Sequence, residues 1–323
     1  MPRGDDARLF EIENALSDQE LAAEAAEALA PAEGERHPEL DTARLWRSRD
    51  DGLLVRGVKP HSAEKSRLVS RGLGTVSSAM SGKWFTRKHG LEYLELYSGP
   101  GRLLDERTGQ EQPGSPLQAL AVAKPFSRYV FSDFSEDCVE ALRARVGDRA
   151  DVSVVQGDAN SPDHLDHVAG LLNPKALLIV YLDPARPQDL HWKTVEYLAE
   201  HFGFVDLIIN LPVNSLMRSI LGAYRGGGTG PGTAGRFLNH PRPHDLLCWT
   251  RTGKLINGST VAAIRDYYDK QLTALGFKTP ARRTIEFPVG NPYYDVLLVS
   301  RHEMARELWD KTNPEPPPPA TLF

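Results

Sequence analysis

The sequence is poor in cysteine and has no long apolar run. Two cysteines, Cys138 and Cys248, occur in 323 residues, and by themselves they cannot form a disulfide framework or a zinc cage. No stretch reaches the roughly 18 consecutive apolar residues that a membrane-spanning helix needs. The opening residues, MPRGDDARLFEIENAL, are acidic and lack the apolar core of a secretory signal. We therefore expect a protein of the reducing cytoplasm, with no membrane segment.

Several sequence signatures of catalysis are absent as well. The chain has no G-x-S-x-G nucleophile motif and no Walker A phosphate-binding motif. His164 and His167 stand three residues apart beside acidic residues, a spacing that can bind a metal on a helix. An exposed polar helix face explains the pair more simply, and we predict no metal site.

The net charge of −5 is unevenly distributed. Residues 1–42 contain 12 acidic and 3 Lys or Arg residues, whereas residues 43–89 contain 3 acidic and 11 basic ones. One interpretation is that the basic stretch faces an anionic partner such as RNA or DNA. The other is that the two stretches pair with each other or are solvated, since charge blocks specify little alone.

The most informative segment is LEYLELYSGPGR, residues 91–102. An apolar run of strand formers ends abruptly in a glycine-rich turn, which is typical of a nucleotide cradle in doubly wound α/β proteins. The turn lacks the third glycine of the dinucleotide fingerprint. It also continues into RLLDERTGQEQP rather than directly into a helix, which disfavours a dinucleotide site.

Four further apolar runs follow, and polar residues end them. They finish at Asp133, Asp158, Asp183 and Asn210, and stretches with helical character lie between them. Such alternation predicts βαβ units and a parallel sheet. Ligands of these sheets bind outside the carboxyl ends of the strands. We therefore expect the three acidic residues to converge at one edge.

The C-terminal part indicates how the sheet is completed. Two strand-like runs, RRTIEFPV and YYDVLLVS, flank a Gly-Asn-Pro hairpin signal. A doubly wound, mostly parallel seven-stranded sheet with a terminal antiparallel hairpin matches the class I methyltransferase-like Rossmann fold, here with an N-terminal helical extension. The glycine-rich stretch 226–235 has the composition of a disordered loop or a lid hinge. The expected organisation is an acidic arm (1–42), a basic helical cap (43–90), the α/β domain (91–304) and a Pro-rich tail (305–323).

In this plan the first three strands hold S-adenosylmethionine. The turn around Tyr97, Gly99 and Gly101 would cradle the amino-acid portion of the cofactor. Asp133 can accept both ribose hydroxyls, because a carboxylate offers two oxygens; Asp158 would lie near the adenine. The residues after these acids, Phe134 and Ala159, belong to the same predicted site. A tight turn, a helix N-cap and turn chemistry are the purely structural alternatives.

Asp183 ends the fourth strand in YLDPARP and faces the transferring methyl group in this plan. It can orient an attacking oxygen or nitrogen, or take its proton. The segment resembles the D-P-P-Y tetrad of amino-group methyltransferases but departs from it at Ala185 and Arg186, and the arginine suggests an anionic group nearby. Asn210 would lie beside the substrate pocket, and Arg218 on the next helix is either a substrate contact or a surface residue.

Together these segments resemble a known family. HSAEK, ELYSGPGR, GSPLQAL, VFSD, GDAN, LDP and NLPVNSLMR, within residues 58–220, are similar to segments of the bacterial three-Cys-motif partner (TcmP) proteins. The resemblance implies a class I methyltransferase-like fold and a protein partner. It also draws attention to His61 and Lys65, one helical turn apart. They could close over the cofactor, or Lys65 could meet a substrate phosphate.

We expect an S-adenosylmethionine-dependent methyltransferase whose acceptor the sequence does not identify. Asp183, Arg186 and Asn210 are the predicted catalytic residues. The alternative is a non-catalytic partner module that binds a nucleotide or S-adenosylmethionine, in association with nucleic acid. A third hypothesis is nucleic-acid binding through residues 43–89, for which affinity would fall steeply with salt.

Overall fold

The computed structural model describes residues 44–59, 61–86, 89–228, 230–286 and 292–314. The predicted acidic arm (1–42) and residues 315–323 of the predicted Pro-rich tail lie outside these ranges. The chain divides into two compact units. The smaller contains residues up to Pro60 together with Leu103–Gln112, and the larger contains His61–Arg102 and Pro113–Phe323.

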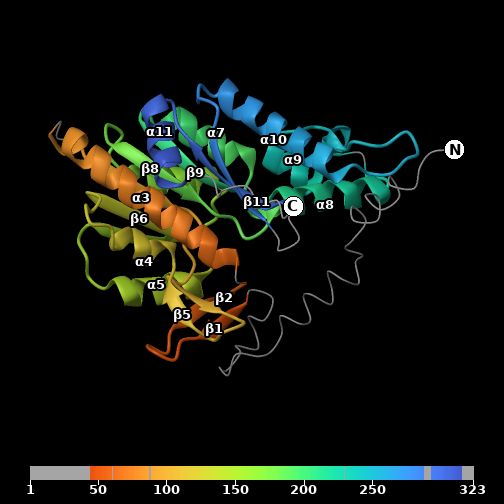
Figure 1. Ribbon diagram of the computed structural model, residues 1–323. Coiled ribbons are helices and arrows are strands. Elements are labelled where there is room, and N and C mark those ends of the chain that lie inside the picture. The colour runs from red at the N-terminus through yellow and green to blue at the C-terminus, as the bar shows by residue number, and fades with distance from the viewer. Residues whose placement is uncertain (1–43, 60, 87–88, 229, 287–291, 315–323) are drawn as a thin grey trace, which may run out of the picture. The chain divides into compact units, whose positions relative to one another are not determined.

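The larger unit is built on a seven-stranded sheet (Figure 1). Its strands are β3 (Leu91–Glu95), β6 (Arg128–Asp133), β7 (Val152–Gln156), β8 (Leu177–Leu182), β9 (Val205–Leu211), β10 (Ala281–Glu286) and β11 (Pro292–Val299). The order is β10-β11-β9-β8-β3-β6-β7, and only β11 runs antiparallel to its neighbours β9 and β10. This is the class I methyltransferase-like Rossmann fold, as the sequence predicts.

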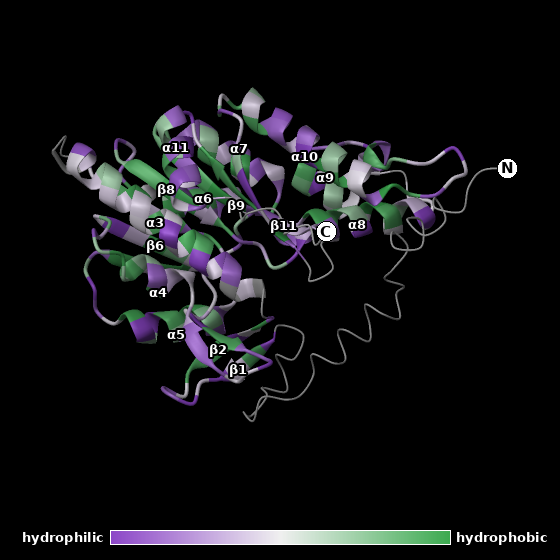
Figure 2. Cartoon of the chain, in the orientation of Figure 1, coloured by the Kyte–Doolittle hydropathy of each residue, from purple (hydrophilic) through white to green (hydrophobic). Residues whose placement is uncertain are grey.

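Helices cover both faces of the sheet and bury two separate cores. Successive strand residues point to opposite faces, so Tyr93 belongs to one core and Leu94 to the other. The first core includes residues of α3 (His61–Thr86), α4 (Ser115–Leu120), α5 (Glu136–Val146) and α11 (Glu303–Thr312). The second includes residues of α6 (Pro162–Gly170), α7 (Trp192–His201), α8 (Val213–Arg225), α9 (Gly232–Leu238) and α10 (Asn257–Ala274). Figure 2 shows the strands between them as mainly hydrophobic.

The smaller unit is a four-stranded sheet in the order β1-β2-β4-β5. The strands are β1 (Leu45–Arg47), β2 (Leu54–Val58), β4 (Arg102–Asp105) and β5 (Glu111–Pro113), around a core of Trp46, Val55 and Leu104. The prediction that residues 43–90 are helical is therefore wrong before His61. A turn at Gly52, with φ of 71°, pairs the first two strands, and β-branched valines favour an extended chain. The strands β4 and β5 also account for the residues between the glycine turn and α4.

Two further segments differ from the sequence prediction. The range 305–323 begins inside α11, because prolines recur only from Pro314 onward. Trp309 of this helix is buried and packs so closely on Gly72 that an added Cβ would lie 2.5 Å from its ring. The glycine-rich stretch 226–235 is not all loop either, since α9 begins at Gly232 and buries Ala234.

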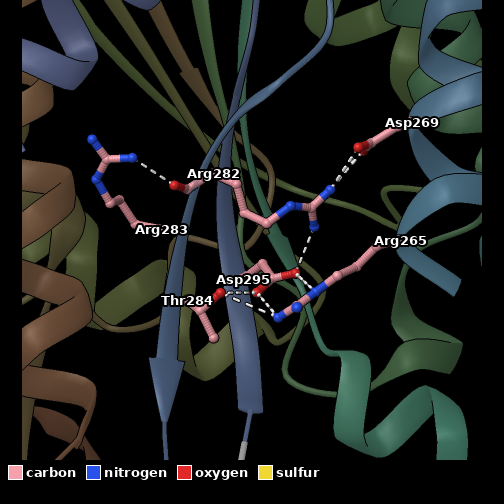
Figure 3. A network of polar contacts seen from close by, with 6 residues as sticks. All are labelled: Arg265, Asp269, Arg282, Arg283, Thr284 and Asp295. Carbon is pink, nitrogen blue, oxygen red and sulfur yellow. Dashed lines mark hydrogen bonds and ion pairs between the residues drawn. The ribbon is translucent and has the colours of Figure 1, made fainter. Parts of the chain in front are cut away.

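A polar network fixes the C-terminal hairpin to α10 (Figure 3). The carboxylate of Asp295, in β11, is fully buried. It accepts hydrogen bonds from Arg265 Nε and Nη2 at 2.8 and 2.7 Å, from Thr284 Oγ1 at 2.8 Å and from Arg282. Arg282 also donates to both carboxylate oxygens of Asp269, on α10. Every oxygen of this buried charge is thus paired, as burial of a charge requires.

Candidate active site at the carboxyl edge of the sheet

The predicted acidic residues lie at the same edge of the sheet. Asp133 is the last residue of β6, Asp158 follows β7 by two residues, and Asp183 directly follows β8. These strands and β3 are parallel, so their carboxyl ends share one edge with the glycine turn. The strand order reverses between β3 and β8, which is the topological switch point where ligands of such sheets bind.

The glycine turn needs its glycines for backbone conformation and for space. Gly99 and Gly101 have φ values of 57° and 87°, in the left-handed region that other residues rarely adopt. A Cβ on Gly101 would lie 2.7 Å from Leu142 Cδ1, and one on Gly114 would lie 2.9 Å from the Gly101 carbonyl oxygen. Gly114 N also donates to that oxygen at 2.8 Å. The backbone before and after residues 102–113 therefore meets at Gly101 and Gly114. We call this backbone contact, which has no room for side chains at the two glycines, the clasp.

Asp133 organises the turn through backbone amides. Its Oδ2 accepts from Gly99 N at 2.7 Å, and its Oδ1 accepts from Ser135 N at 3.0 Å. The N-cap of α5 is Ser135, whose hydroxyl accepts from Cys138 N. The alternative interpretation of Asp133 as the cap is therefore wrong. Beside it, Phe134 is 75% exposed and leaves an apolar side chain in solvent, directly after the last residue of β6.

Asp158 is exposed and accepts from the backbone and side-chain nitrogens of Asn160 at 2.8 and 3.2 Å, which is turn chemistry. Ala159 between them is buried. Asn160 Nδ2 and the Tyr97 hydroxyl both donate to the carbonyl oxygen of Asp189, at 3.0 and 2.7 Å. Tyr97 thus ties the glycine turn to the segment that follows β8, and the pKa of its buried hydroxyl is raised well above 10 by burial.

Asp183 lies in a cluster of predicted residues. Lys65 Nζ, from α3, donates to both of its carboxylate oxygens at 2.8 and 2.7 Å, and Asn210 Nδ2 donates to Oδ1 at 2.8 Å. The ammonium group also lies 5.3 Å from the centroid of the Tyr294 ring. Lys65 and Asp183 are each about one fifth exposed. The lysine therefore meets the carboxylate of its own chain, a contact that neither sequence hypothesis for it included.

Asn210 carries an unsatisfied polar atom. The residue is only 6% exposed, and its Oδ1 has no hydrogen-bond partner among the described residues. A buried acceptor without a donor costs free energy. Such an atom beside a partly exposed ion pair fits a site where a ligand supplies the missing donor.

Arg186 lies apart from this cluster. Its side chain is 67% exposed and forms an ion pair with Asp189, three residues along the chain, at 3.0 Å. The arginine predicted beside Asp183 thus stabilises a local turn instead. Arg218 is exposed on α8. The side chain of His61 is outside those that the structure describes.

Sequence reasoning missed Glu95, the last residue of β3. Its carboxyl group is fully buried and accepts from the hydroxyl groups of Ser115 and Tyr93. Burial raises its pKa to about 8, and the nearby charges of Asp183 and Asp133 contribute. The signal was an acidic residue inside an apolar run, immediately before the glycine turn.

The histidine pair differs from its prediction. His164 is buried rather than exposed, and its Nε2 lies 2.7 Å from Ser132 Oγ. A Cβ on Gly157 would lie 2.0 Å from the imidazole ring, so the ring occupies the space that a side chain there would need. Burial lowers the pKa of His164. Within the described ranges, no three His, Cys, Asp or Glu residues form a group that could hold a metal ion.

Comparisons with known proteins give distant structural likenesses. No family model and no curated protein matches the chain. Similar solved structures include a fibrillarin pre-rRNA processing protein of Methanococcus jannaschii, 14% identical over 66% of each chain with a TM-score of 0.37. Others are a SAM-dependent methyltransferase of Anabaena variabilis (10%, 66% of this chain and 77% of that one, 0.33) and magnesium protoporphyrin IX methyltransferase of Synechocystis with bound SAH (16%, 73% and 84%, 0.35).

Likenesses at this level do not carry over an activity or a substrate. In the described parts of the chain, every helix is too short or too polar to cross a bilayer.

Proposed function

We propose that this protein is an S-adenosylmethionine-dependent methyltransferase. The observation that carries the proposal is the Lys65–Asp183–Asn210 cluster beside the glycine turn, at the switch point of the sheet. Elements far apart in the sequence contribute to it, and the cluster is partly open to solvent. A partly exposed polar cluster at the ligand-binding edge of a sheet indicates a role in binding or catalysis rather than in stability.

The residues of the first three strands fit the cofactor. The tight backbone around Gly99 and Gly101 allows close approach of its amino-acid portion. Asp133 uses one lone pair on each oxygen for a backbone amide, which leaves others for the ribose hydroxyls. The exposed ring of Phe134 offers an apolar face to the adenine, with Asp158 near its polar edge. When bound, S-adenosylmethionine supplies an electrophilic methyl group.

The cluster around Asp183 would position the acceptor. Transfer is an in-line displacement, so alignment of the attacking atom accounts for much of the rate. The Asp183 carboxylate accepts a hydrogen bond from an O–H or N–H group of the substrate that is methylated. Beside it, Asn210 Oδ1 is a second hydrogen-bond acceptor, without a donor among the described residues. Lys65 holds the carboxylate in one orientation through two hydrogen bonds. The acceptor therefore carries at least one polar hydrogen at the atom that is methylated or next to it.

The finer predictions remain proposals. Kinship with the TcmP proteins is supported by the motifs in residues 58–220, and it would give the protein a protein partner. The domain limits of 91–304 and the cytoplasmic location remain predictions as well. Nucleic-acid binding through residues 43–89 is less well supported, because that stretch is divided between the two units.

Calorimetric titration with S-adenosylhomocysteine tests the proposal. We expect wild-type protein to bind it, and Phe134→Ala to weaken binding about ten-fold through loss of the stacking face. Phe204→Ala is the matched control, since Phe204 is also an exposed phenylalanine but precedes β9 at the opposite edge of the sheet. If S-adenosylhomocysteine, NAD and ATP all fail to bind, only the fold assignment stands.

The non-catalytic alternative is separated by turnover. A methyltransferase transfers a labelled methyl group, whereas a sensor or scaffold binds S-adenosylhomocysteine equally well and transfers none. Ala185 and Arg186 stand where the D-P-P-Y tetrad has proline and tyrosine, and this departure supports the non-catalytic alternative.

A further inference from the structure

The segment that follows β9 exposes two large aromatic rings in contact. Tyr224, on α8, is 49% exposed and Trp249 is 39% exposed. Their ring centroids are 5.6 Å apart, and His244 lies 6.2 Å from the tyrosine ring. Single exposed apolar residues are common, but a contiguous aromatic pair on a surface marks an interaction site.

A tight hairpin holds the tryptophan. Trp249 forms an isolated antiparallel bridge with Leu255, and Thr250 N donates to the Lys254 carbonyl at 2.8 Å. The turn closes with Gly253 N donating to Thr250 O, and Gly253 has a φ of 80°. A tight turn followed by a glycine with positive φ is a regular hairpin geometry. The ring is therefore presented by ordered backbone.

The same segment is strongly basic, in contrast to the net charge of −5 of the whole chain. Between Val213 and Ile256 the only acidic residue is Asp245, and the Lys and Arg residues are Arg218, Arg225, Arg236, Arg242, Arg251 and Lys254. Asp245 pairs with Arg242 at 3.1 Å. Arg225, Arg251 and Lys254 are exposed and form no ion pair with any described residue.

These three exposed cations, which pair with no carboxylate among the described residues, lie in the same segment as the two exposed rings. One class of ligand matches both features. Phosphates of a nucleic-acid backbone satisfy the cations, and unpaired bases stack on the rings. A duplex keeps its bases stacked inside and offers none to a flat aromatic side chain. An anionic lipid surface matches the charge but offers no planar groups that would stack on the two rings.

We propose that Tyr224, Trp249, Arg225, Arg251 and Lys254 form an aromatic–basic surface that binds single-stranded nucleic acid. Its elements start at the candidate active site, because α8 begins three residues after Asn210. The short helix η2 (Pro187–Asp189), close behind Asp183, packs against α9 of the same segment. Tyr224 lies near the far end of α8, roughly 16 Å from the first residue of the helix, so a bound strand would run along this segment to reach the cluster. That the strand is also the methyl acceptor is an extension that rests on the proposed function, whereas the binding does not.

Tryptophan emission tests binding directly. Of the five tryptophans in the chain, Trp46, Trp84, Trp192 and Trp309 are buried and only Trp249 is substantially exposed. Titration of the full chain, without cofactor, with oligo-U RNA and oligo-dT DNA of about 12 nucleotides should quench the exposed component. The two arms distinguish RNA from DNA. No quenching by either overturns the proposal.

Anisotropy of labelled oligonucleotides tests the residues. We expect Tyr224→Ala and Trp249→Ala each to weaken binding about ten-fold, and Trp249→Phe, which keeps a ring, to retain most of it. Phe204→Ala is the matched control for loss of an exposed ring and should bind as wild type. If Trp249→Ala does not fold, the affinity of Trp249→Phe and the quenching of wild-type tryptophan emission still test the proposal. Unchanged affinity in both ring variants overturns the proposal.

The charges are tested by salt dependence. Each phosphate contact to a single strand contributes about 0.7 to the slope of log affinity against log salt. The double variant Arg251→Ala, Lys254→Ala should therefore flatten the slope by about 1.4. The double variant Lys278→Ala, Arg306→Ala removes two exposed charges elsewhere and should leave it unchanged. Equal slopes in the first variant and wild type, or preference for duplex DNA or phosphatidylserine vesicles, overturn the proposal.

Discussion

Asp183 and Asp295 are both carboxylates of the large sheet that pair with cationic side chains, yet their surroundings differ. Asp295 is fully buried, and two arginines and a threonine fill the lone pairs of both oxygens (Figure 3). Asp183 is partly exposed, and its Lys65 and Asn210 partners leave the neighbouring amide oxygen of Asn210 unpaired. Residue types alone do not distinguish a structural ion pair from one that is available to a ligand. Solvent access and unfilled hydrogen-bonding capacity do.

The sharpest test of this contrast removes the charge at Asp183. Asp183→Asn should lower methyl transfer at least about 100-fold, because an oriented carboxylate in acid–base or positioning roles contributes on that scale. Affinity for S-adenosylhomocysteine should remain within about three-fold of wild type. Transfer of label from S-adenosylmethionine to a cell extract, alongside calorimetry, measures both. Full turnover in the variant would contradict the role given to this residue.

The corresponding change at Asp295 should act on stability. Asp295→Asn removes the buried counter-charge of Arg265 and leaves Arg282 with Asp269 alone, so we expect the free energy of unfolding to fall by about 3–5 kcal/mol. Urea denaturation followed by circular dichroism measures it. Folded variant should still bind S-adenosylhomocysteine. A stability unchanged from wild type would show that the network in Figure 3 is dispensable.

Glu95 extends the comparison to a buried acid that has no cationic partner among the described residues. Its pKa is about 8 in the folded protein, against an ordinary value of 4.5. The folded state therefore binds the proton more tightly, and wild-type stability should fall as the pH rises from about 4.5 to about 8. Glu95→Gln has no ionisable group at this position and lacks this part of the decline in stability. The stability of the variant relative to wild type should therefore rise across that pH range.

Denaturation at about pH 5 and about pH 8 measures the effect of Glu95→Gln. Asp206→Asn is the matched control, because burial raises the pKa of Asp206 only to about 6 and its effect is complete at lower pH. A constant difference between Glu95→Gln and wild type at both pH values would contradict the shifted pKa.

The smallest change in stability is expected at Lys65. Lys65→Met removes one partner of a pair that is about one fifth exposed, so solvent screens much of the cost and unfolding should change by roughly 1–2 kcal/mol. Methyl transfer should nevertheless fall at least about ten-fold, because Asp183 loses two of its hydrogen bonds. A larger loss of stability than in Asp295→Asn would reverse the comparison.

Sequence patterns predicted the strands of the large sheet and the acidic residues at their ends, because apolar runs and their punctuation are local. They did not predict the pairing of Lys65 with Asp183, which are 118 residues apart and meet only through the fold. Arg186 shows the opposite case: its charge, assigned to the site by proximity in sequence, forms an ion pair with Asp189 three residues away. The strands before His61 were missed because basic residues obscured a short alternating pattern.

The clasp between Gly101 and Gly114 has a consequence for the architecture of the chain. Because the two backbones meet at 2.8 Å, the loop between them begins and ends at one point of the large unit. A segment of any length between Gly101 and Gly114 would start and end at the same point, as the segment with β4 and β5 does. Its length would not change the spacing of the residues in the glycine turn. The segment Leu103–Gln112 can thus vary without disturbing the glycine turn: a version of the chain with a minimal turn in its place would lose β5 and most of β4 but keep the backbone geometry that follows β3.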